Sequence, residues 1–307
     1  MKYSHQDIFS KTFLDIPIST ILSSVEEKGY FSFSQALCPE FLGKLYKELK
    51  SRNSGVNIND VCPVLYHQQL FYVHALAGSE TFFNLLTNEF VLDLCEKNFS
   101  SEFRLKCQRY YENGYGYKMS WHTDTKTTEN VKTNVKGLIF IIYIEDTFDG
   151  EFQLISGSHK HSQEKEYTEY SDTEIENFHE DSIVSFKMPG GSLVVYDTNC
   201  IHRAKPIEDK DFVRKSIFFQ VDEDLLHGEK VLLNSEFLKC MNPRLEKYLG
   251  FGLPTIYVTQ PQTSLDTMTD DQLSVVLKSC LQRIGSKKRF IKITVFAIKK
   301  LLRKLFT

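Results

Sequence analysis

The chain has 307 residues, 41% of them hydrophobic, which suits one large domain or one domain with an appendage and excludes collagen, a coiled coil and a disordered chain. It has no secretory signal pattern and no apolar run of about 18 residues, so the sequence predicts neither secretion nor a membrane span. The net charge of −3 is uneven, because residues 272–307 carry 10 of the 37 basic residues and no acid, whereas 27 basic and 40 acidic residues give residues 1–271 a net charge of −13.

Three helices are predicted in the first part of the chain, over 19–29, 39–50 and 79–98. In each of them apolar residues recur at helical spacing, while polar residues occupy the opposite face. Residues 51–60 are predicted to form a polar loop. We expect this helical segment, about 19–98, to support one face of the strands that follow.

From about residue 103 the pattern changes to that of strands. Runs rich in β-branched and aromatic residues, with Gly, Asp or Asn nearby, lie at 103–111, 137–145, 151–155, 192–197 and 215–221. Several strands without regular intervening helices favour a mainly β fold, an antiparallel β-sandwich or jelly roll, over about 103–222. The polar stretch 160–182 interrupts the strands, and we interpret it as a surface insertion with a short helix that acts as a lid or selects the substrate.

The segment H-T-D at 122–124 is the first candidate site. Residues i and i+2 of an extended segment point to the same side, so His122 and Asp124 can bind one ion. An imidazole and a carboxylate suit iron(II), and a second imidazole leaves three positions open for a cosubstrate and dioxygen. H-Q-D at 5–7 has the same spacing, but no strand is predicted beside it. H-T-D at 122–124 is followed later in the chain by a predicted strand and a short turn that end at His202, which can supply the second imidazole.

Four motifs follow one another in a specific order: H-T-D at 122–124, G-S-H-K at 157–160, P-G-G-S-L-V-V-Y-D-T-N-C-I-H at 189–202 and R-K-S at 214–216. Together they resemble the phytanoyl-CoA dioxygenase family of iron(II)/2-oxoglutarate-dependent oxygenases. The resemblance covers roughly residues 25–221. The segments YYENGYGYKMSWHTD and FIIYIEDTFDGEFQL are also similar to the prolyl-hydroxylase branch of the superfamily, so an enzyme acting on a protein side chain stays an alternative.

The resemblance implies a double-stranded β-helix (a jelly-roll or cupin-like core) in which His122, Asp124 and His202 hold Fe(II) at the catalytic centre. It also implies that Arg214 binds the distal carboxylate of 2-oxoglutarate, a task that suits a planar guanidinium whose charge does not titrate. The implied reaction consumes O2 and 2-oxoglutarate, releases succinate and CO2, and hydroxylates an unactivated C–H bond. A catalytically silent jelly-roll binding protein with the same pocket is the alternative from another class.

Other residues are further candidates for the pocket. Ser216 lies two residues along the strand from Arg214 and faces the same way, so it is a candidate cofactor-binding residue. Tyr111, on the strand before the Gly-rich turn, is a candidate contact to the oxoacid. The strand at 140–143 offers no unambiguous pocket residue. Trp121 adjoins the ligands, but its side chain should point away from them, so it packs in the core or forms a wall of the pocket.

The sequence pattern predicts a basic amphipathic helix over residues 287–307, with apolar residues on one face and five Lys or Arg on the other. This pattern predicts a segment that lies on an anionic membrane surface, and a helix docked on the domain or on a second subunit is the alternative. Nucleic acid is disfavoured as a partner because the main body is acidic.

The chain is therefore predicted to consist of an oxygenase domain at 1–222 and a C-terminal helical extension at 223–307. Seven widely spaced cysteines without a C-x-x-C pair argue against disulfides and zinc, so a cytoplasmic protein is expected, peripheral at the inner membrane face if the tail binds there. The expected substrate is small, or linked to a lipid or glycan. The pattern indicates no oligomeric state.

Overall fold

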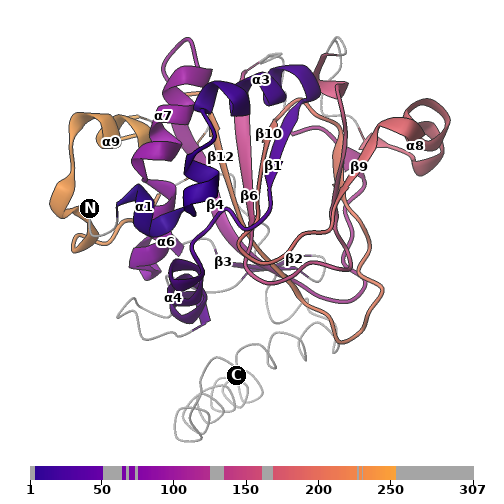
Figure 1. The fold of residues 1–307 in the computed structure, drawn as a ribbon, viewed down its shortest axis with the longest axis horizontal. Helices are drawn as coiled ribbons and strands as arrows, with labels where there is room; N and C mark the ends of the chain where they lie inside the picture. Colours follow the sequence, from indigo (N-terminus) through magenta and orange to yellow (C-terminus); the bar gives the residue numbers. More distant parts are fainter. Residues whose placement is uncertain are drawn as a thin grey trace, which may run out of the picture.

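The computed structural model describes residues 4–50, 64–66, 69–72, 75–124, 135–160, 169–226, 228–229 and 231–253. Figure 1 shows two facing β-sheets, with most helices on one side of the larger sheet and α8 beyond the smaller one. The helices are α1 (His5–Ile8), α2 (Lys11–Leu14), α3 (Ile18–Lys28), α4 (Pro39–Lys50), α5 (Ala75–Gly78), α6 (Glu80–Leu86), α7 (Glu89–Asn98), α8 (Asp172–His179) and α9 (Pro243–Tyr248). Short 3-10 turns are η1 (Ser158–Lys160), η2 (Glu180–Ser182) and η3 (Phe237–Cys240).

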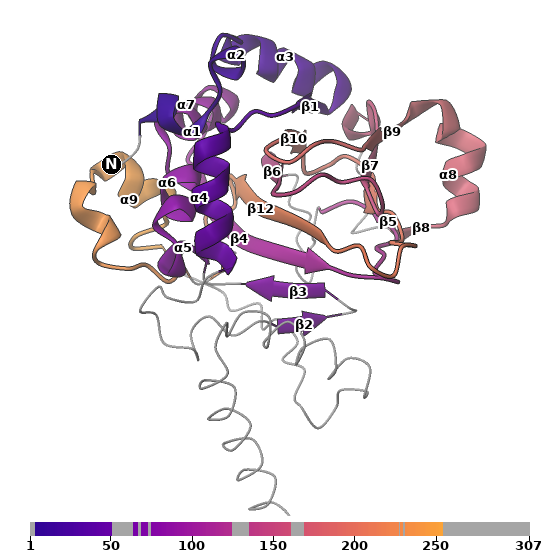
Figure 2. The ribbon, with the colours of Figure 1, turned by 60° about the horizontal axis from the view of Figure 1, so that its bottom comes forward.

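The strands form two antiparallel sheets that together make the predicted double-stranded β-helix. The larger sheet has the order β1-β10-β6-β12-β4-β3-β2, with β1 (Tyr30–Phe33), β10 (Leu193–Asp197), β6 (Gly137–Tyr143), β12 (Arg214–Asp222), β4 (Arg104–Asn113), β3 (Gln69–Tyr72) and β2 (Val64–Tyr66). The smaller sheet has the order β8-β5-β11-β7-β9, with β8 (Glu169–Tyr170), β5 (Trp121–His122), β11 (His202–Ala204), β7 (Phe152–Ile155) and β9 (Ile183–Phe186). Figure 2 shows β4, β3 and β2 side by side at one edge of the larger sheet.

Strand β6 shows why its sequence is a continuous apolar run. Alternate residues point to opposite faces of a strand, and both faces of β6 are buried. Phe140 and Ile142 pack into the cluster that the helices cover, and Phe140 stacks on Phe219 with ring centroids 4.4 Å apart. Ile141 and Tyr143 pack into a second cluster between the two sheets. The core is thus two layers, one on each side of the larger sheet.

The predicted helices are mostly confirmed. Those at 19–29 and 39–50 correspond to α3 and α4. The single helix predicted over 79–98 is wrong in one respect, because it breaks into α6 and α7 at Thr87 and Asn88. Asn88 has extended backbone, and its side chain accepts a hydrogen bond from the Phe90 amide at 2.9 Å, which starts a new helix.

Strand β1 lies within the segment that the sequence predicted to be helical support. It pairs with β10 at the edge of the larger sheet. Gly29 ends α3 in a left-handed conformation (φ 85°) and turns the chain into this strand. Four residues are too few for a periodic signal, which is why the pattern of the sequence did not reveal β1.

Residues beyond β12 pack against the helical layer. Arg244 in α9 forms ion pairs with Asp93 and Glu96 of α7. The buried Arg104 guanidinium lies between two glycines of this segment, since a Cβ atom at Gly228 or Gly250 would come within 2.6 Å of it. The domain boundary at residue 222 stays a prediction, and the tail at 287–307 lies outside the described residues. No helix in the described part of the chain has the length and apolar character to cross a membrane.

Candidate metal centre

Two neighbouring strands of the smaller sheet bring the candidate ligands together. His202 on β11 is the cross-strand partner of His122 on β5, and both side chains are buried. Asp124 follows β5, and its amide donates to the Thr198 carbonyl at 3.2 Å. Its two carboxylate oxygens lie 3.8 Å from His122 Nε2 and 3.3 Å from His202 Nε2. Within the described residues these three form the one cluster of potential metal donors, with all donor atoms within 4.8 Å of one another.

Both imidazoles are oriented by their own backbone. His122 Nδ1 lies 2.7 Å from the Ser120 carbonyl, and His202 Nδ1 lies 3.0 Å from the Cys200 carbonyl. A carbonyl only accepts hydrogen bonds, so each Nδ1 carries a hydrogen, and in the neutral imidazole each Nε2 then keeps its lone pair. This arrangement of the second ring nitrogen is typical of histidines that bind metal.

The electrostatic surroundings keep His122 neutral. Burial, followed by the neighbouring His202, lowers the pKa of His122 to about 4, and Asp124 opposes the shift. Protonation of a buried imidazole is unfavourable because the charge loses its hydration. At neutral pH the site therefore offers a neutral imidazole, which is the form that binds a metal ion.

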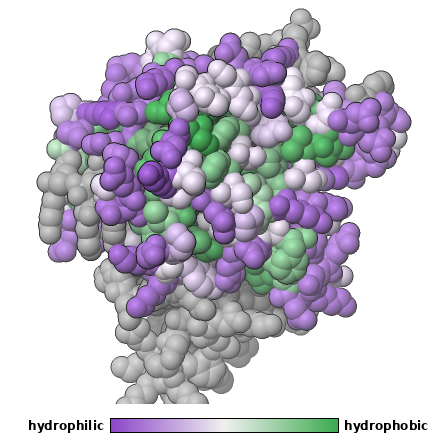
Figure 3. Space-filling model, in the orientation of Figure 1, coloured by the Kyte–Doolittle hydropathy of each residue, from purple (hydrophilic) through white to green (hydrophobic). Residues whose placement is uncertain are grey.

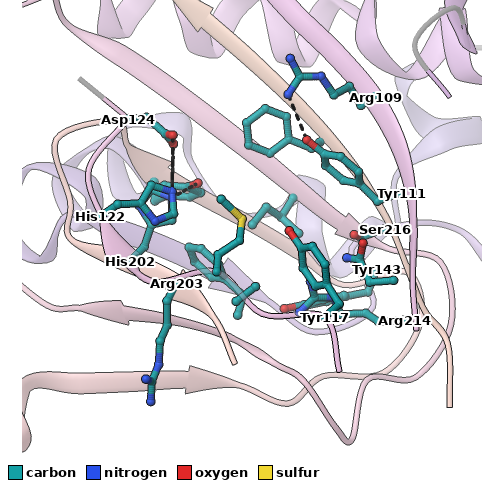
Figure 4. Close-up of a pocket in the computed structure, with 17 residues that line it drawn as sticks. Arg109, Tyr111, Tyr117, His122, Asp124, Tyr143, His202, Arg203, Arg214 and Ser216 are labelled. Carbon is teal, nitrogen blue, oxygen red and sulfur yellow. Dashed lines mark hydrogen bonds and ion pairs between the residues drawn. The ribbon is translucent and has the colours of Figure 1, made fainter. Parts of the chain in front are cut away.

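A cavity of about 140 Å³ opens beside these three residues, and its lining includes every residue that the sequence predicted to bind the metal or the oxoacid. Figure 4 shows His122, Asp124 and His202 at one end, with Arg214, Ser216 and Tyr143 grouped at the other. The remaining lining residues are Arg109, Tyr111, Asn113, Tyr117, Met119, Ile141, Phe152, Tyr196, Arg203, Ala204 and Phe218. The fold thus places the Arg214 guanidinium at the opposite end of the cavity from the candidate ligands.

Register in the larger sheet explains the group around Arg214. Ser216 pairs with Tyr111 of β4 on one side and with Tyr143 of β6 on the other. The Arg214 side chain is 6% exposed, donates to the Gly150 carbonyl, and has its guanidinium carbon 5.8 Å from the centre of the Tyr117 ring. A buried cation with hydrogen-bonding capacity left over suits an anionic ligand.

Tyr111 is held in place by a neighbouring ion pair. Arg109 donates to its hydroxyl at 3.2 Å and forms an ion pair with Glu229. Burial raises the pKa of Tyr111 to about 12, although Arg109 acts in the opposite direction. Tyr111 is therefore a neutral phenol at the cavity wall, and its contact with the oxoacid stays a prediction.

Sequence reasoning missed several wall residues. Tyr143 and Ile141 face the cavity, while Phe140 faces the helices. Side chains alternate between the two faces of β6, so Ile141 and Tyr143 could have been predicted to face the cavity once Phe140 was assigned to the helical side. Tyr196 and Asn113 carry no such local signal, because their position depends on which strands pair in the sheet.

Trp121 and the H-Q-D segment at 5–7 lie outside the candidate metal site. Trp121 is 1% exposed and packs with Ile155, Ile175 and Ile201, so it belongs to the core. H-Q-D at 5–7 lies in helix α1, where residues two apart do not share a face.

A double-stranded β-helix that encloses two histidines and one carboxylate defines a class, the non-haem iron oxygenases. The family model of phytanoyl-CoA dioxygenase (PhyH) matches residues 33–216, more than half of the chain. The chain belongs to this family, and it is a non-haem iron, 2-oxoglutarate-dependent oxygenase. No curated protein matches it in sequence.

Solved structures with the same fold come from several such enzymes. HygX from Streptomyces hygroscopicus, with nickel, 2-oxoglutarate and hygromycin B bound, is 13% identical, with 69% of this chain and 90% of that chain covered and a TM-score of 0.52. The epimerase SnoN, in complex with Fe3+, alpha ketoglutarate and nogalamycin RO, is 13% identical (74% and 90% covered, TM-score 0.53). EctD from S. alaskensis, with 2-oxoglutarate and 5-hydroxyectoine, is 16% identical (67% and 76% covered, TM-score 0.52). At these identities the likeness establishes the fold.

The insertion at 160–182 is tied to the strands that carry the histidines. Its strand β8 pairs with β5, with Glu169 opposite His122. Asp172, the first residue of α8, accepts from the indole nitrogen of Trp121 at 3.1 Å and forms an ion pair with Arg203. Trp121 precedes one histidine and Arg203 follows the other, and the Arg203 guanidinium carbon lies 4.4 Å from the Trp121 ring centre. The outer surface of α8 is hydrophilic (Figure 3).

We predict that Asp172→Ala loosens α8 from the smaller sheet. Trp121 is the only tryptophan of the chain, so its fluorescence reports on this position alone. Loss of the carboxylate removes an acceptor from the indole and should let water reach the ring, which shifts the emission to longer wavelength. The cost in stability should be about 1 kcal/mol or less because the ion pair is exposed. Glu176→Ala, on the exposed side of α8, is the control, and identical spectra for both variants would refute this prediction.

Proposed function

We propose that this protein is an Fe(II)- and 2-oxoglutarate-dependent dioxygenase that hydroxylates an unactivated C–H bond of a small molecule, free or linked to a lipid or glycan. One observation carries the proposal, namely that three metal donors and a buried arginine face one cavity. The donor set fits the metal, because neutral imidazole nitrogens and a carboxylate on one side suit iron(II) and leave room for exogenous ligands. His122, Asp124 and His202 would hold the ion.

Bound Fe(II) and 2-oxoglutarate supply the oxidation of a C–H bond by O2, with succinate and CO2 as co-products. The chain itself contributes orientation and a dry site. Arg214 would bind the distal carboxylate of the oxoacid, with Ser216 beside it as a hydroxyl donor and Tyr111 on the neighbouring strand. Arg214 and Ser216 are buried, so a charge-assisted hydrogen bond there is weakly screened by water.

Small molecules are favoured as substrates over a protein side chain. The family model that matches is that of phytanoyl-CoA dioxygenase, and the structures of HygX and SnoN contain hygromycin B and nogalamycin RO. The insertion carrying α8 borders the smaller sheet next to β5. We infer that this insertion contributes to the choice of substrate, as loops on rigid sheets often do.

The test of the function is turnover of 2-oxoglutarate. We expect succinate to form from 2-oxoglutarate with Fe(II) and ascorbate, slowly without a prime substrate, and His122→Ala to lose this activity. His159→Ala is the matched control, since His159 lies 3.0 Å from the Glu26 carbonyl and outside the cavity. A silent binding protein would give no succinate in any substrate screen.

Metal binding can be measured without turnover. Ni2+ or Co2+ should quench Trp121, the neighbour of His122, and EDTA should reverse the effect. His122→Ala or Asp124→Ala should weaken binding at least about 100-fold, because even residues behind metal ligands contribute 10–100-fold. Equal affinity in these variants and in the wild type would contradict the assignment of the ligands.

Arg214→Lys should raise the dissociation constant of 2-oxoglutarate about tenfold or more while leaving Co2+ affinity unchanged. A lysine keeps the charge but loses the two-pronged geometry, and hydrogen bonds to charged groups contribute about 1.5–3 kcal/mol. Lys215→Ala is the control, because Lys215 lies on the same strand but bonds to Glu145 and Tyr46 on the other face. Unchanged oxoacid affinity in the Arg214 variant would remove this residue from the site.

For residues 287–307 we propose binding to an anionic membrane surface from the cytoplasmic side. The support is the basic amphipathic pattern of the sequence, in which each basic residue could add about 1 kcal/mol near anionic lipid. In a flotation assay with anionic liposomes, the full chain should float and a chain ending near residue 285 should not. Equal flotation of the two would exclude this role for the tail.

A further inference from the structure

Tyr196 places a phenol beside one of the candidate metal ligands. It lies on β10, is 1% exposed and lines the cavity. Its hydroxyl is 3.4 Å from His202 Nε2, and its ring centroid is 5.0 Å from that of His202 and 4.9 Å from that of Phe152. Tyr196 lies within the motif at 189–202, but neither the interpretation of that motif nor the proposed mechanism gives its side chain a role.

The direction of this hydrogen bond follows from the tautomer of His202. In the neutral imidazole, which is the form that binds a metal ion, His202 Nδ1 donates to the Cys200 carbonyl, so Nε2 has no hydrogen and accepts from Tyr196. The same Nε2 lone pair is the one directed at Asp124 and the metal position. A bound ion and the phenol therefore compete for a single lone pair.

When a metal ion takes this lone pair, the Tyr196 hydroxyl needs another acceptor. A buried donor left without a partner is unfavourable, and nearly all buried polar groups in proteins are hydrogen-bonded. The new acceptor has to lie in the cavity, because the ring is packed on Phe152 and His202 and the hydroxyl is already directed there.

The two sheets indicate which acceptor this is. The candidate ligands come from β5, the residues just after it, and β11, all on the smaller sheet. Tyr196 comes from β10 on the larger sheet, as Arg214 and Ser216 come from β12. The phenol thus lies beside the metal position but belongs to a different sheet from the protein donors.

We propose, on the basis of the proposed metal centre, that Tyr196 donates a hydrogen bond to the anion that occupies the open positions of the bound metal. A ligand oxygen or nitrogen with negative charge, such as the carboxylate of an oxoacid, is the class of acceptor. Tyr196 is then a residue that selects and positions an anion at the metal, separate from Arg214 at the far end of the cavity.

Azide tests this role, because it binds a metal ion directly and has no distal carboxylate for Arg214. The Co2+-loaded wild type and Tyr196→Phe are titrated with azide and followed by visible absorption. We expect azide to bind about tenfold more weakly to Tyr196→Phe, as a lost hydrogen bond to a charged group implies. The affinity for Co2+ should stay within about twofold, because the phenylalanine keeps the ring packing.

Tyr143→Phe is the matched control, since it removes a buried hydroxyl from the same cavity near Arg214 (Figure 4) and should leave azide affinity unchanged. Equal azide affinity in the wild type and Tyr196→Phe, including no binding by either, would overturn the proposal. A loss of Co2+ affinity with azide binding intact would also overturn it, because the phenol would then support Asp124. A wild type that binds no Co2+ would instead refute the metal centre itself.

Discussion

The pairing of β5 with β11 is the constraint on which the rest of the site depends. It sets His122 directly opposite His202, and the two imidazole centroids lie 4.3 Å apart. A shift of one residue in this register would turn one ring to the other face of the sheet. Neighbouring strands on both sides, β8 and β7, fix the pair in place. The metal centre is therefore a property of the sheet as much as of the histidines.

The two sheets contribute different groups to the cavity. The smaller sheet presents the metal donors, and the larger sheet presents Arg214, Ser216 and the tyrosines. The larger sheet is packed on its other face by the helical layer, which makes its wall rigid. A ligand in the cavity would therefore contact both sheets, and the distance between the sheets is set by the core side chains packed between them.

Local spacing made part of this site predictable. His122 and Asp124 are two residues apart on an extended segment, and Arg214 and Ser216 likewise, so a strand pattern was enough to pair them. Tyr196 and Asn113 reach the cavity only through the order and register of strands distant in sequence, which no local pattern encodes. The break at Asn88 was hidden for a different reason, because an apolar stripe continues across it and the cap is a single residue.

Each histidine is oriented by a peptide carbonyl two residues before it, at Ser120 and at Cys200. A carbonyl belongs to every amino acid, so no substitution at those two positions removes the acceptor. The residues of the cavity wall can then change in evolution while the imidazole rings keep their orientation, provided that the backbone of the two strands is unchanged. Such a separation between an invariant anchor and a variable lining would let one scaffold take up new substrates without losing the means to oxidise them.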